Sequence, residues 1–167
     1  GELGAFLKYV ESTDPKDYAA NIGQFVAKEY DTIVTVGFLM AEASALAATE
    51  NPNINFVGVD QFQGETLPNL TGLIFAEDQA GYAAGYLAGL MTETNKVGAV
   101  LGTDTVPPVL YFGEGYRNGV IAANPEAEVT VVYHEPANAF TDPEWGAAEA
   151  KKQVTQGADV VFGAGGG

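Results

Sequence analysis

Short apolar runs of four to six residues alternate along this chain with longer segments of helical character. Most of the runs are continuously apolar and rich in Val, Ile and Leu, which is typical of strands covered on both faces. Parallel strands need long crossover connections, and the intervening segments can supply them as helices. The pattern therefore predicts an α/β fold with parallel sheets. The predicted strands are 5–10, 32–36, 55–59, 72–75, 97–101, 129–133 and 159–162.

Two of the predicted helices carry signals at their ends. Asp14-Pro15 can begin a helix with proline at its first position, and an apolar stripe runs from Tyr18 to Tyr30. Thr141 or Asp142 is expected to cap a second helix, in which Glu144 can complete a capping box. Gly157 is expected to end that helix before the last strand.

Three glycines, Gly81, Gly85 and Gly89, lie four residues apart in an apolar helical segment. This spacing puts them on one ridge of the helix, where another backbone can approach closely. The same spacing occurs in membrane helix dimers, but the apolar stretch 80–91 is too short to cross about 30 Å of hydrocarbon. We expect a helix packed inside a globular protein.

One connection interrupts the strand–helix rhythm. The residues between Asp60 and Thr71 form turns and are too few for a crossover helix, yet an apolar strand follows at once. A strand reached in this way is expected to leave its sheet and act as a hinge. The predicted organisation is part of a first lobe at 1–70, a crossing strand and helix at 71–95, and part of a second lobe at 96–167.

The composition limits the classes of function. With 47% hydrophobic and 17% charged residues the chain can bury a core, and its formal net charge is −15. Seven scattered cations form no stripe that could bind phosphates, so nucleic-acid binding is excluded, and an anionic membrane would repel the chain. A neutral or cationic small ligand is favoured. Cysteine is absent, which excludes disulfides and thiolate sites.

Several catalytic chemistries lack their residues. The sequence has two serines, one histidine and no Gly-x-Ser-x-Gly motif, which argues against a serine hydrolase. No glycine precedes a lysine, so a phosphate-binding P-loop is excluded. His134 without cysteines cannot build the usual zinc sites, and we interpret it as a polar residue at the end of a strand. Neither a metal nor a cofactor is expected.

Residues after the predicted strands are the candidates for ligand binding, because open α/β sheets bind ligands at the carboxyl ends of their strands. They are Phe38, Asp60, Phe140 and the glycines Gly165 and Gly166. An aromatic ring can stack on a flat ligand while a carboxylate accepts its N–H groups, which suits a neutral heterocycle. The alternatives are that Asp60 caps a turn, that Phe140 fills core and that the glycines form a plain turn.

Longer segments resemble a known family. YDTIVTVGF at 30–38, FAEDQAGYAAGYLAG at 75–89 and QGADVVF at 156–162 resemble the basic membrane protein family of nucleoside-binding lipoproteins, also called purine nucleoside receptor A-like. Shorter matches keep the same order and spacing over essentially the whole chain. They lie at 9–12, 17–22, 96–98, 124–125 and 140–143.

The resemblance implies a type I periplasmic-binding-protein-like fold, with two parallel-sheet lobes, helices on both faces and a ligand cleft between the lobes. It implies that Asp60 binds the base, that Phe140 stacks on it, that Gly165 and Gly166 contact the ribose region, and that Phe38 adds a contact. The implied function is binding a purine nucleoside without catalysis for the permease and ATPase of an ABC importer. The implied location is extracytoplasmic, with a lipid anchor outside this chain.

The resemblance also implies that the fold is incomplete at both ends, because the family's first strand would precede residue 1 and further segments would follow residue 167. An unpaired sheet edge is then expected, through which the fragment can self-associate. Two other functions stay open. The same fold can serve a ligand sensor or regulator, and an enzyme that processes nucleosides could use Asp60 as a base.

Overall fold

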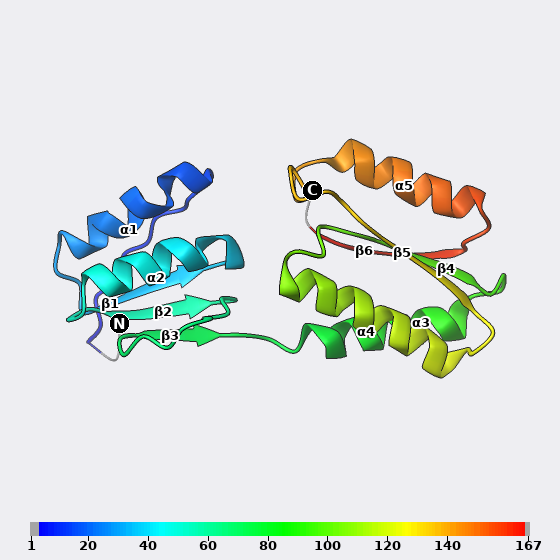
Figure 1. Cartoon of the computed structure of the whole chain (residues 1–167), viewed down its shortest axis with the longest axis horizontal. Helices are drawn as coiled ribbons and strands as arrows, with labels where there is room; N and C mark the ends of the chain where they lie inside the picture. Colours follow the sequence, from blue (N-terminus) through cyan, green and yellow to red (C-terminus); the bar gives the residue numbers. More distant parts are fainter. Residues whose placement is uncertain (1–3, 166–167) are drawn as a thin grey trace. The chain divides into compact units, whose positions relative to one another are not determined.

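The computed structural model describes residues 4–165, which divide between Phe75 and Ala76 into two compact units. Each unit contains one three-stranded parallel sheet with its own hydrophobic core. The predicted α/β class with parallel sheets is confirmed. Figure 1 identifies the elements of both units.

The first unit holds a sheet of order β1-β2-β3, formed by Thr32–Val36, Asn55–Val59 and Leu70–Leu73. Helices α1 (Tyr18–Val26) and α2 (Ala41–Glu50) lie on one face of it, as Figure 1 shows. Exposure in β1 therefore alternates, with Ile33 buried and Val34 open. Single-turn 3-10 helices, η1 (Pro15–Asp17) and η2 (Phe38–Met40), precede the two helices.

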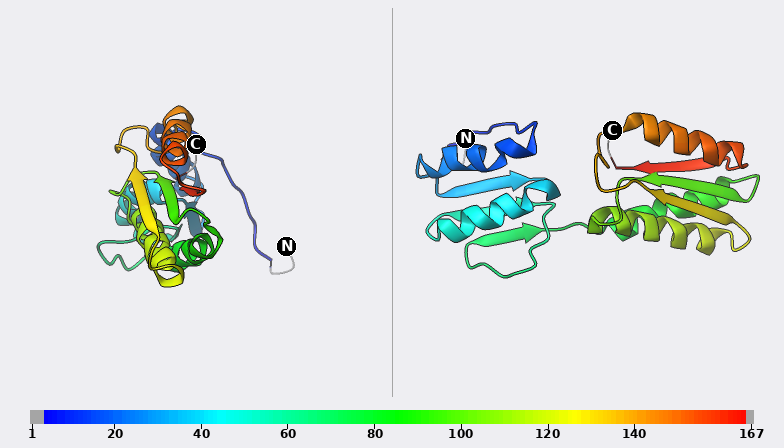
Figure 2. Two further views of the ribbon diagram at one scale, coloured as in Figure 1. Left: turned by 90° about the vertical axis from the view of Figure 1, so that its right-hand side faces the viewer. Right: turned by 45° about the horizontal axis from the view of Figure 1, so that its top comes forward.

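The second unit holds a sheet of order β5-β4-β6, formed by Glu128–Tyr133, Lys96–Leu101 and Val160–Ala164. Helices α3 (Glu77–Met91) and α4 (Pro107–Ala123) cover one face, and α5 (Pro143–Thr155) covers the other, which is clear in the right-hand view of Figure 2. The central strand β4 is accordingly almost fully buried, as the continuous apolar run predicted.

The glycine ridge of α3 packs against α4. A Cβ atom on Gly85 would meet the carbonyl oxygen of Tyr116, and one on Gly89 would lie 2.8 Å from that of Val120. Gly115 and Gly119 of α4 in turn leave room for the backbone of α3. The predicted close approach is confirmed, and glycines on both helices make it possible.

The predicted helix ends agree with the structure in most details. The Asp14 side chain accepts a hydrogen bond from the Lys16 N–H at the start of η1, and Asp142 rather than Thr141 caps α5 by accepting from the Trp145 N–H at 2.9 Å. Gly157 follows α5 with a φ of +102°. A left-handed residue of this kind commonly ends a helix.

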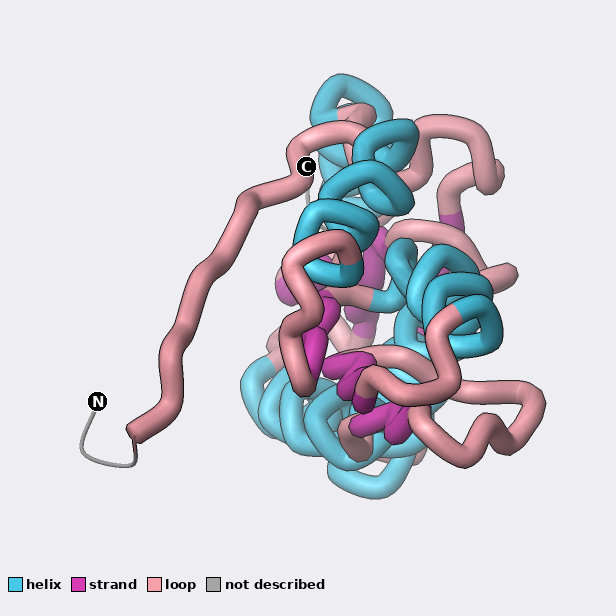
Figure 3. Tube along the Cα trace, turned by 90° about the vertical axis from the view of Figure 1, so that its left-hand side faces the viewer, coloured by secondary structure: helices cyan, strands magenta, loops and turns pink. Residues whose placement is uncertain are grey.

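One predicted strand is absent, and another has shifted bounds. Residues 5–10 form loop, visible in the N-terminal stretch of Figure 3, because no described strand pairs with them. The strand predicted at 72–75 is β3, which begins at Leu70 and pairs in parallel with β2 through Leu73 instead of leaving the sheet. The chain passes to the second unit directly after it, between Phe75 and Ala76. The ten-residue span from Asp60 to Asn69 is long enough to reach the neighbouring position without a helix.

None of the helices within residues 4–165 is long and apolar enough to cross a membrane.

Candidate ligand-binding site

The carboxyl ends of β4 and β6 bring two predicted site residues together at Gly102. A Cβ atom on Gly102 would lie 2.6 Å from Cε1 of the Phe140 ring, so the ring packs directly over this glycine. Gly165 also lies close to Gly102, because its own Cβ would lie 2.7 Å from the Gly102 nitrogen. Gly102 N–H donates to the Ala164 carbonyl at 3.0 Å, which fixes the two strand ends.

Phe140 is partly buried and packs against the core of the second unit. This position agrees with the alternative that the ring fills core, and it leaves part of the ring accessible at the sheet edge. Both descriptions are compatible, since the ring packs over Gly102 while the residue as a whole stays partly exposed. Whether Phe140 stacks on a ligand therefore stays a prediction.

The loop after β4 adds hydroxyl groups to this edge. Thr103 is 2% exposed, and its Oγ1 lies 3.1 Å from Oγ1 of Thr105. The chain then enters α4 at Pro107, whose missing N–H costs nothing at a helix start. Sequence reasoning missed Gly102 and Thr103, although both directly follow a predicted strand.

The loops at this edge are acidic. Residues 102–106 and 134–142 contain Asp104, Glu135 and Asp142 but neither lysine nor arginine. A bound phosphate would meet carboxylates here without a lysine or arginine to compensate for them. The edge is suited to an uncharged or cationic ligand.

Phe38 and Asp60 lie at the carboxyl edge of the first sheet. Val36 and Val59, which precede them in β1 and β2, are register partners, and the Gly37 N–H donates to the Val59 carbonyl at 2.9 Å. Asp60 has a φ of +58°, which aspartate tolerates in turns. The turn interpretation of Asp60 thus fits its backbone, and its contact with a base stays a prediction.

Gln61, which the sequence analysis missed, fixes this edge. Its side chain is fully buried, and Nε2 donates to Thr35 Oγ1 at 3.1 Å and to the Gly37 carbonyl at 3.0 Å. Its backbone N–H donates to the Leu73 carbonyl at 3.2 Å. One side chain and its backbone thereby tie together the ends of β1 and β3 beside Asp60.

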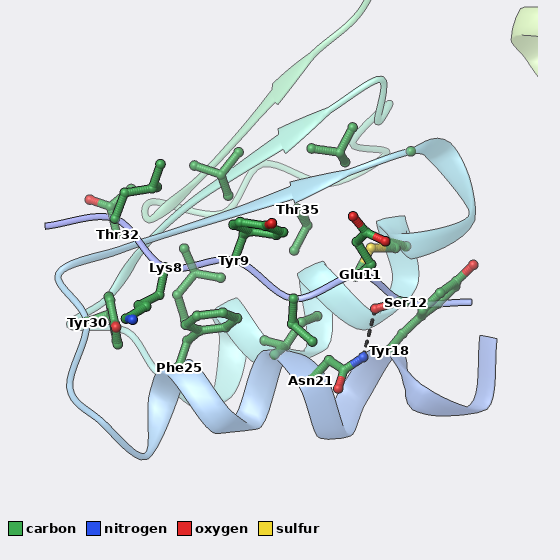
Figure 4. Close-up of a pocket in the computed structure, with 18 of the residues that line it drawn as sticks. Lys8, Tyr9, Glu11, Ser12, Tyr18, Asn21, Phe25, Tyr30, Thr32 and Thr35 are labelled. Carbon is green, nitrogen blue, oxygen red and sulfur yellow. Dashed lines mark hydrogen bonds between the residues drawn. The ribbon is translucent and has the colours of Figure 1, made fainter. Parts of the chain in front are cut away.

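A cavity of about 610 Å³ lies in the first unit, between the extended segment 6–12 and β1. Figure 4 shows Tyr9 and Phe25 in its lining and a hydrogen bond of 2.9 Å from Asn21 to Ser12, which holds the segment on α1. The described ladders pair β1 only with β2, so the cavity opens along the unpaired edge of β1. Among the predicted site residues, Phe38 alone lines it.

Gly166 lies outside the described residues. The structure therefore shows Gly165 at the edge of the second sheet but not its neighbour.

The comparison with known families is decisive. The model of the Bmp family, described as "ABC transporter substrate-binding protein PnrA-like", matches residues 2–167. The chain belongs to this family. The predicted resemblance is confirmed.

Two curated relatives illustrate the match. The "ABC transporter nucleoside-binding protein BmpA" of Lactococcus lactis is 30% identical over 164 residues, covering 98% of this chain and 45% of the relative. The "Uncharacterized lipoprotein PF1695" of Pyrococcus furiosus is 29% identical over 167 residues, covering 97% of this chain and 42% of the relative. The chain spans less than half the length of these relatives.

Solved structures agree on the fold. An ABC transporter solute-binding protein from Aeropyrum pernix K1 matches with a TM-score of 0.76 at 27% identity, over 93% of this chain and 44% of that one. A transcriptional activator of the comK gene from Bacillus halodurans matches with a TM-score of 0.70 at 27% identity, over 92% of this chain and 50% of that one. The fold of the family is the predicted periplasmic-binding-protein-like fold.

Proposed function

We propose that this chain belongs to a substrate-binding protein that captures a purine nucleoside and delivers it to an ABC importer. The observation that carries the proposal is the family match over residues 2–167, together with the Phe140 ring packed over Gly102 at the carboxyl edge of the second sheet. In a family of solute-binding proteins, an accessible aromatic at this edge is suited to stack on a flat ring. The name of the Lactococcus relative supports a nucleoside as the solute.

The polar groups of the chain fit the remaining parts of such a ligand. Asp60 is proposed to accept hydrogen bonds from base N–H groups, and Phe38 to add an apolar contact. Gly165 and Gly166 are proposed to allow the ribose to approach the backbone, since neither carries a side chain. The acidic loops favour a nucleoside over a nucleotide, because the 5′-phosphate would be repelled.

The proposed partners are the permease and ATPase subunits of the importer. A lipid anchor outside this chain would hold the protein on the outer side of the cell membrane, which the lipoprotein name of the Pyrococcus relative supports. Binding and release, without a chemical step, are then sufficient for the function. Incubation with the protein should leave the nucleoside intact, as chromatography can show.

One specific observation favours a second function, that of a ligand-responsive regulator. The Bacillus halodurans protein with the same fold and 27% identity is described as a transcriptional activator. Both roles need the same ligand-binding fold. Retention of the protein by detergent-solubilised permease would support transport.

Isothermal titration tests the proposal. The protein expressed from its complete gene, with this chain alongside, is titrated with adenosine, guanosine, inosine, cytidine and uridine and with adenosine 5′-monophosphate. We expect the purine nucleosides to bind, the monophosphate to bind more weakly, and Phe140→Ala to weaken purine binding by about 1–3 kcal/mol through lost stacking and burial.

Val154→Ala, which shortens an exposed side chain on α5, is the matched control and should leave affinity unchanged. Absence of purine binding by the folded, ligand-free protein would overturn the nucleoside assignment. Unchanged purine affinity in Phe140→Ala would remove Phe140 from the site.

A further inference from the structure

The loop that carries Phe140 is closed at its base by His134 and Asp142. His134 follows the last residue of β5, and its Nε2 lies 3.3 Å from Asp142 Oδ2 at the start of α5. The other carboxylate oxygen, Oδ1, accepts from the Trp145 N–H at 2.9 Å and caps the helix. One carboxylate thus joins the helix cap to the strand end, although Asp142 and His134 lie eight positions apart in the sequence.

His134 is held on its remaining sides as well. Its backbone N–H donates to the Gly102 carbonyl at 2.6 Å, which places it beside the glycine under the Phe140 ring. Its Nδ1 lies 2.6 Å from the Glu135 carbonyl oxygen, and its ring meets the Trp145 ring edge to face at 4.5 Å. The side chain is only 11% exposed.

We infer that His134 is a positioning residue that, through Asp142, holds the 134–142 loop in place and so presents the Phe140 ring to the ligand. The inference rests on the proposed function for the identity of the ligand. Residues 135–138 of the loop are exposed, and the Thr141 N–H donates to the Asn138 carbonyl at 2.9 Å, so the contact between His134 and Asp142 joins the two ends of an otherwise exposed turn. A ring that is already ordered before binding loses less conformational entropy when the ligand stacks on it.

Both contacts can be hydrogen bonds at the same time only in the protonated form of His134. The two ring nitrogens face the Glu135 carbonyl and the Asp142 carboxylate. Neither of these two oxygen groups can donate a hydrogen bond to the ring while Asp142 is ionised. A neutral imidazole has one N–H and can satisfy one of the two, whereas an imidazolium has two N–H groups and satisfies both. The loop should therefore be held most firmly when His134 is charged.

The hydrogen-bond acceptors around the imidazole also favour its protonated form. The hydrogen bond to the Glu135 carbonyl is the main cause that raises the pKa of His134, and the Asp142 and Glu135 carboxylates add to it. The Trp145 N–H and then His134 lower the pKa of Asp142. Because the pKa of His134 is raised in the fold, its contribution is complete below its ordinary value of about 6.5 and disappears as the pH rises through the folded value.

The tryptophan provides a direct readout, since Trp145 is the only tryptophan of the chain. A protonated imidazole quenches indole fluorescence more strongly than a neutral one. In the full chain, Trp145 emission excited at 295 nm should therefore increase with pH, with a midpoint above 6.5. His134→Gln should abolish this titration, and Asp142→Asn should lower its midpoint. A flat emission between pH 5 and 9 in the wild type would overturn the inference.

Loop order and affinity then test the positioning role. NMR order parameters of the 135–141 amides should fall as the pH rises through the fluorescence midpoint, and should be low at every pH in His134→Ala. Purine nucleoside affinity should fall about fivefold over the same range, equivalent to one ordinary hydrogen bond. In His134→Gln, whose amide keeps one N–H donor toward Asp142, affinity should no longer depend on pH.

The outcomes separate this inference from the proposed function. Fluorescence and order parameters that titrate without any nucleoside binding would support the positioning role and refute the ligand. If the protein binds nucleosides but the loop order parameters and the affinity stay constant through the fluorescence midpoint, the positioning role is refuted. The assignment of a nucleoside as the ligand would then still stand. Unchanged melting temperatures of the variants at pH 9 would show that a fold defect is not the cause of lost affinity.

Discussion

Replacing Gly102 by alanine should move the Phe140 ring without removing it. The new Cβ would lie 2.6 Å from Phe140 Cε1, whereas carbon atoms pack at about 3.5–4.0 Å. The ring must therefore withdraw by about 1 Å, because the alternative is a steric overlap. Gly102 φ does not lie in the left-handed region, so the alanine adds no backbone strain of that kind.

The expected loss of affinity follows from this displacement. Offset stacking contributes about 0.5–1.5 kcal/mol beyond the buried area, and buried apolar surface adds about 25 cal/mol per Å². A ring displaced by about 1 Å keeps part of both, so we expect binding of a purine nucleoside to weaken by about 1–2 kcal/mol, or about 5- to 30-fold. The substitution should also lower the free energy of unfolding by about 1–3 kcal/mol through overpacking.

The assay is isothermal titration of Gly102→Ala beside Gly146→Ala, at a temperature where both remain folded. Gly146 lies in α5 with open space around its Cβ position, so alanine there should leave affinity unchanged. Equal affinities of Gly102→Ala and the wild type, in a variant whose ring is shown by NMR to have moved, would refute the role of Phe140 as a stacking platform.

Two further predictions concern packing and the sheet edge. Gly85→Ala should destabilise the second unit by about 1–3 kcal/mol, because the new Cβ would collide with the Tyr116 carbonyl. Gly23→Ala, which has open space around it in α1, should instead stabilise the first unit by about 0.5–1 kcal/mol. Chemical denaturation followed by circular dichroism measures both free energies of unfolding, and equal effects would contradict the close packing of α3 on α4. The wild-type chain should self-associate through the unpaired edge and exposed face of β1. In sedimentation velocity, Val34→Lys should reduce this association more than Leu46→Lys on α2 does. A wild-type chain that stays monomeric at high concentration would contradict the prediction.

Local signals in the sequence predicted much of the fold. The strands 32–36 and 55–59 have the predicted bounds, because continuous apolar runs with turn residues on both sides specify short parallel strands. Asp142 and Gly157 mark the ends of α5 because capping depends on nearby backbone groups. The run at 5–10 has the same composition but forms loop, since a strand also needs a partner that composition does not supply.

The candidate site was predictable in part. Strand ends indicated Phe38, Asp60, Phe140 and Gly165, because the carboxyl edge of a parallel sheet is a general position for ligands. The contact of Phe140 with Gly102 depends on the path of a long loop, which no local pattern determines. The buried hydrogen bonds of Gln61 likewise depend on tertiary packing, and a glutamine beside a turn gave no signal of them.

A crystal structure of the protein with a bound purine nucleoside would test the central claim most directly. The account predicts a base plane lying against the Phe140 ring at about 3.5–4 Å. A base bound away from Phe140, with that ring buried entirely in the core of the second unit, would contradict it.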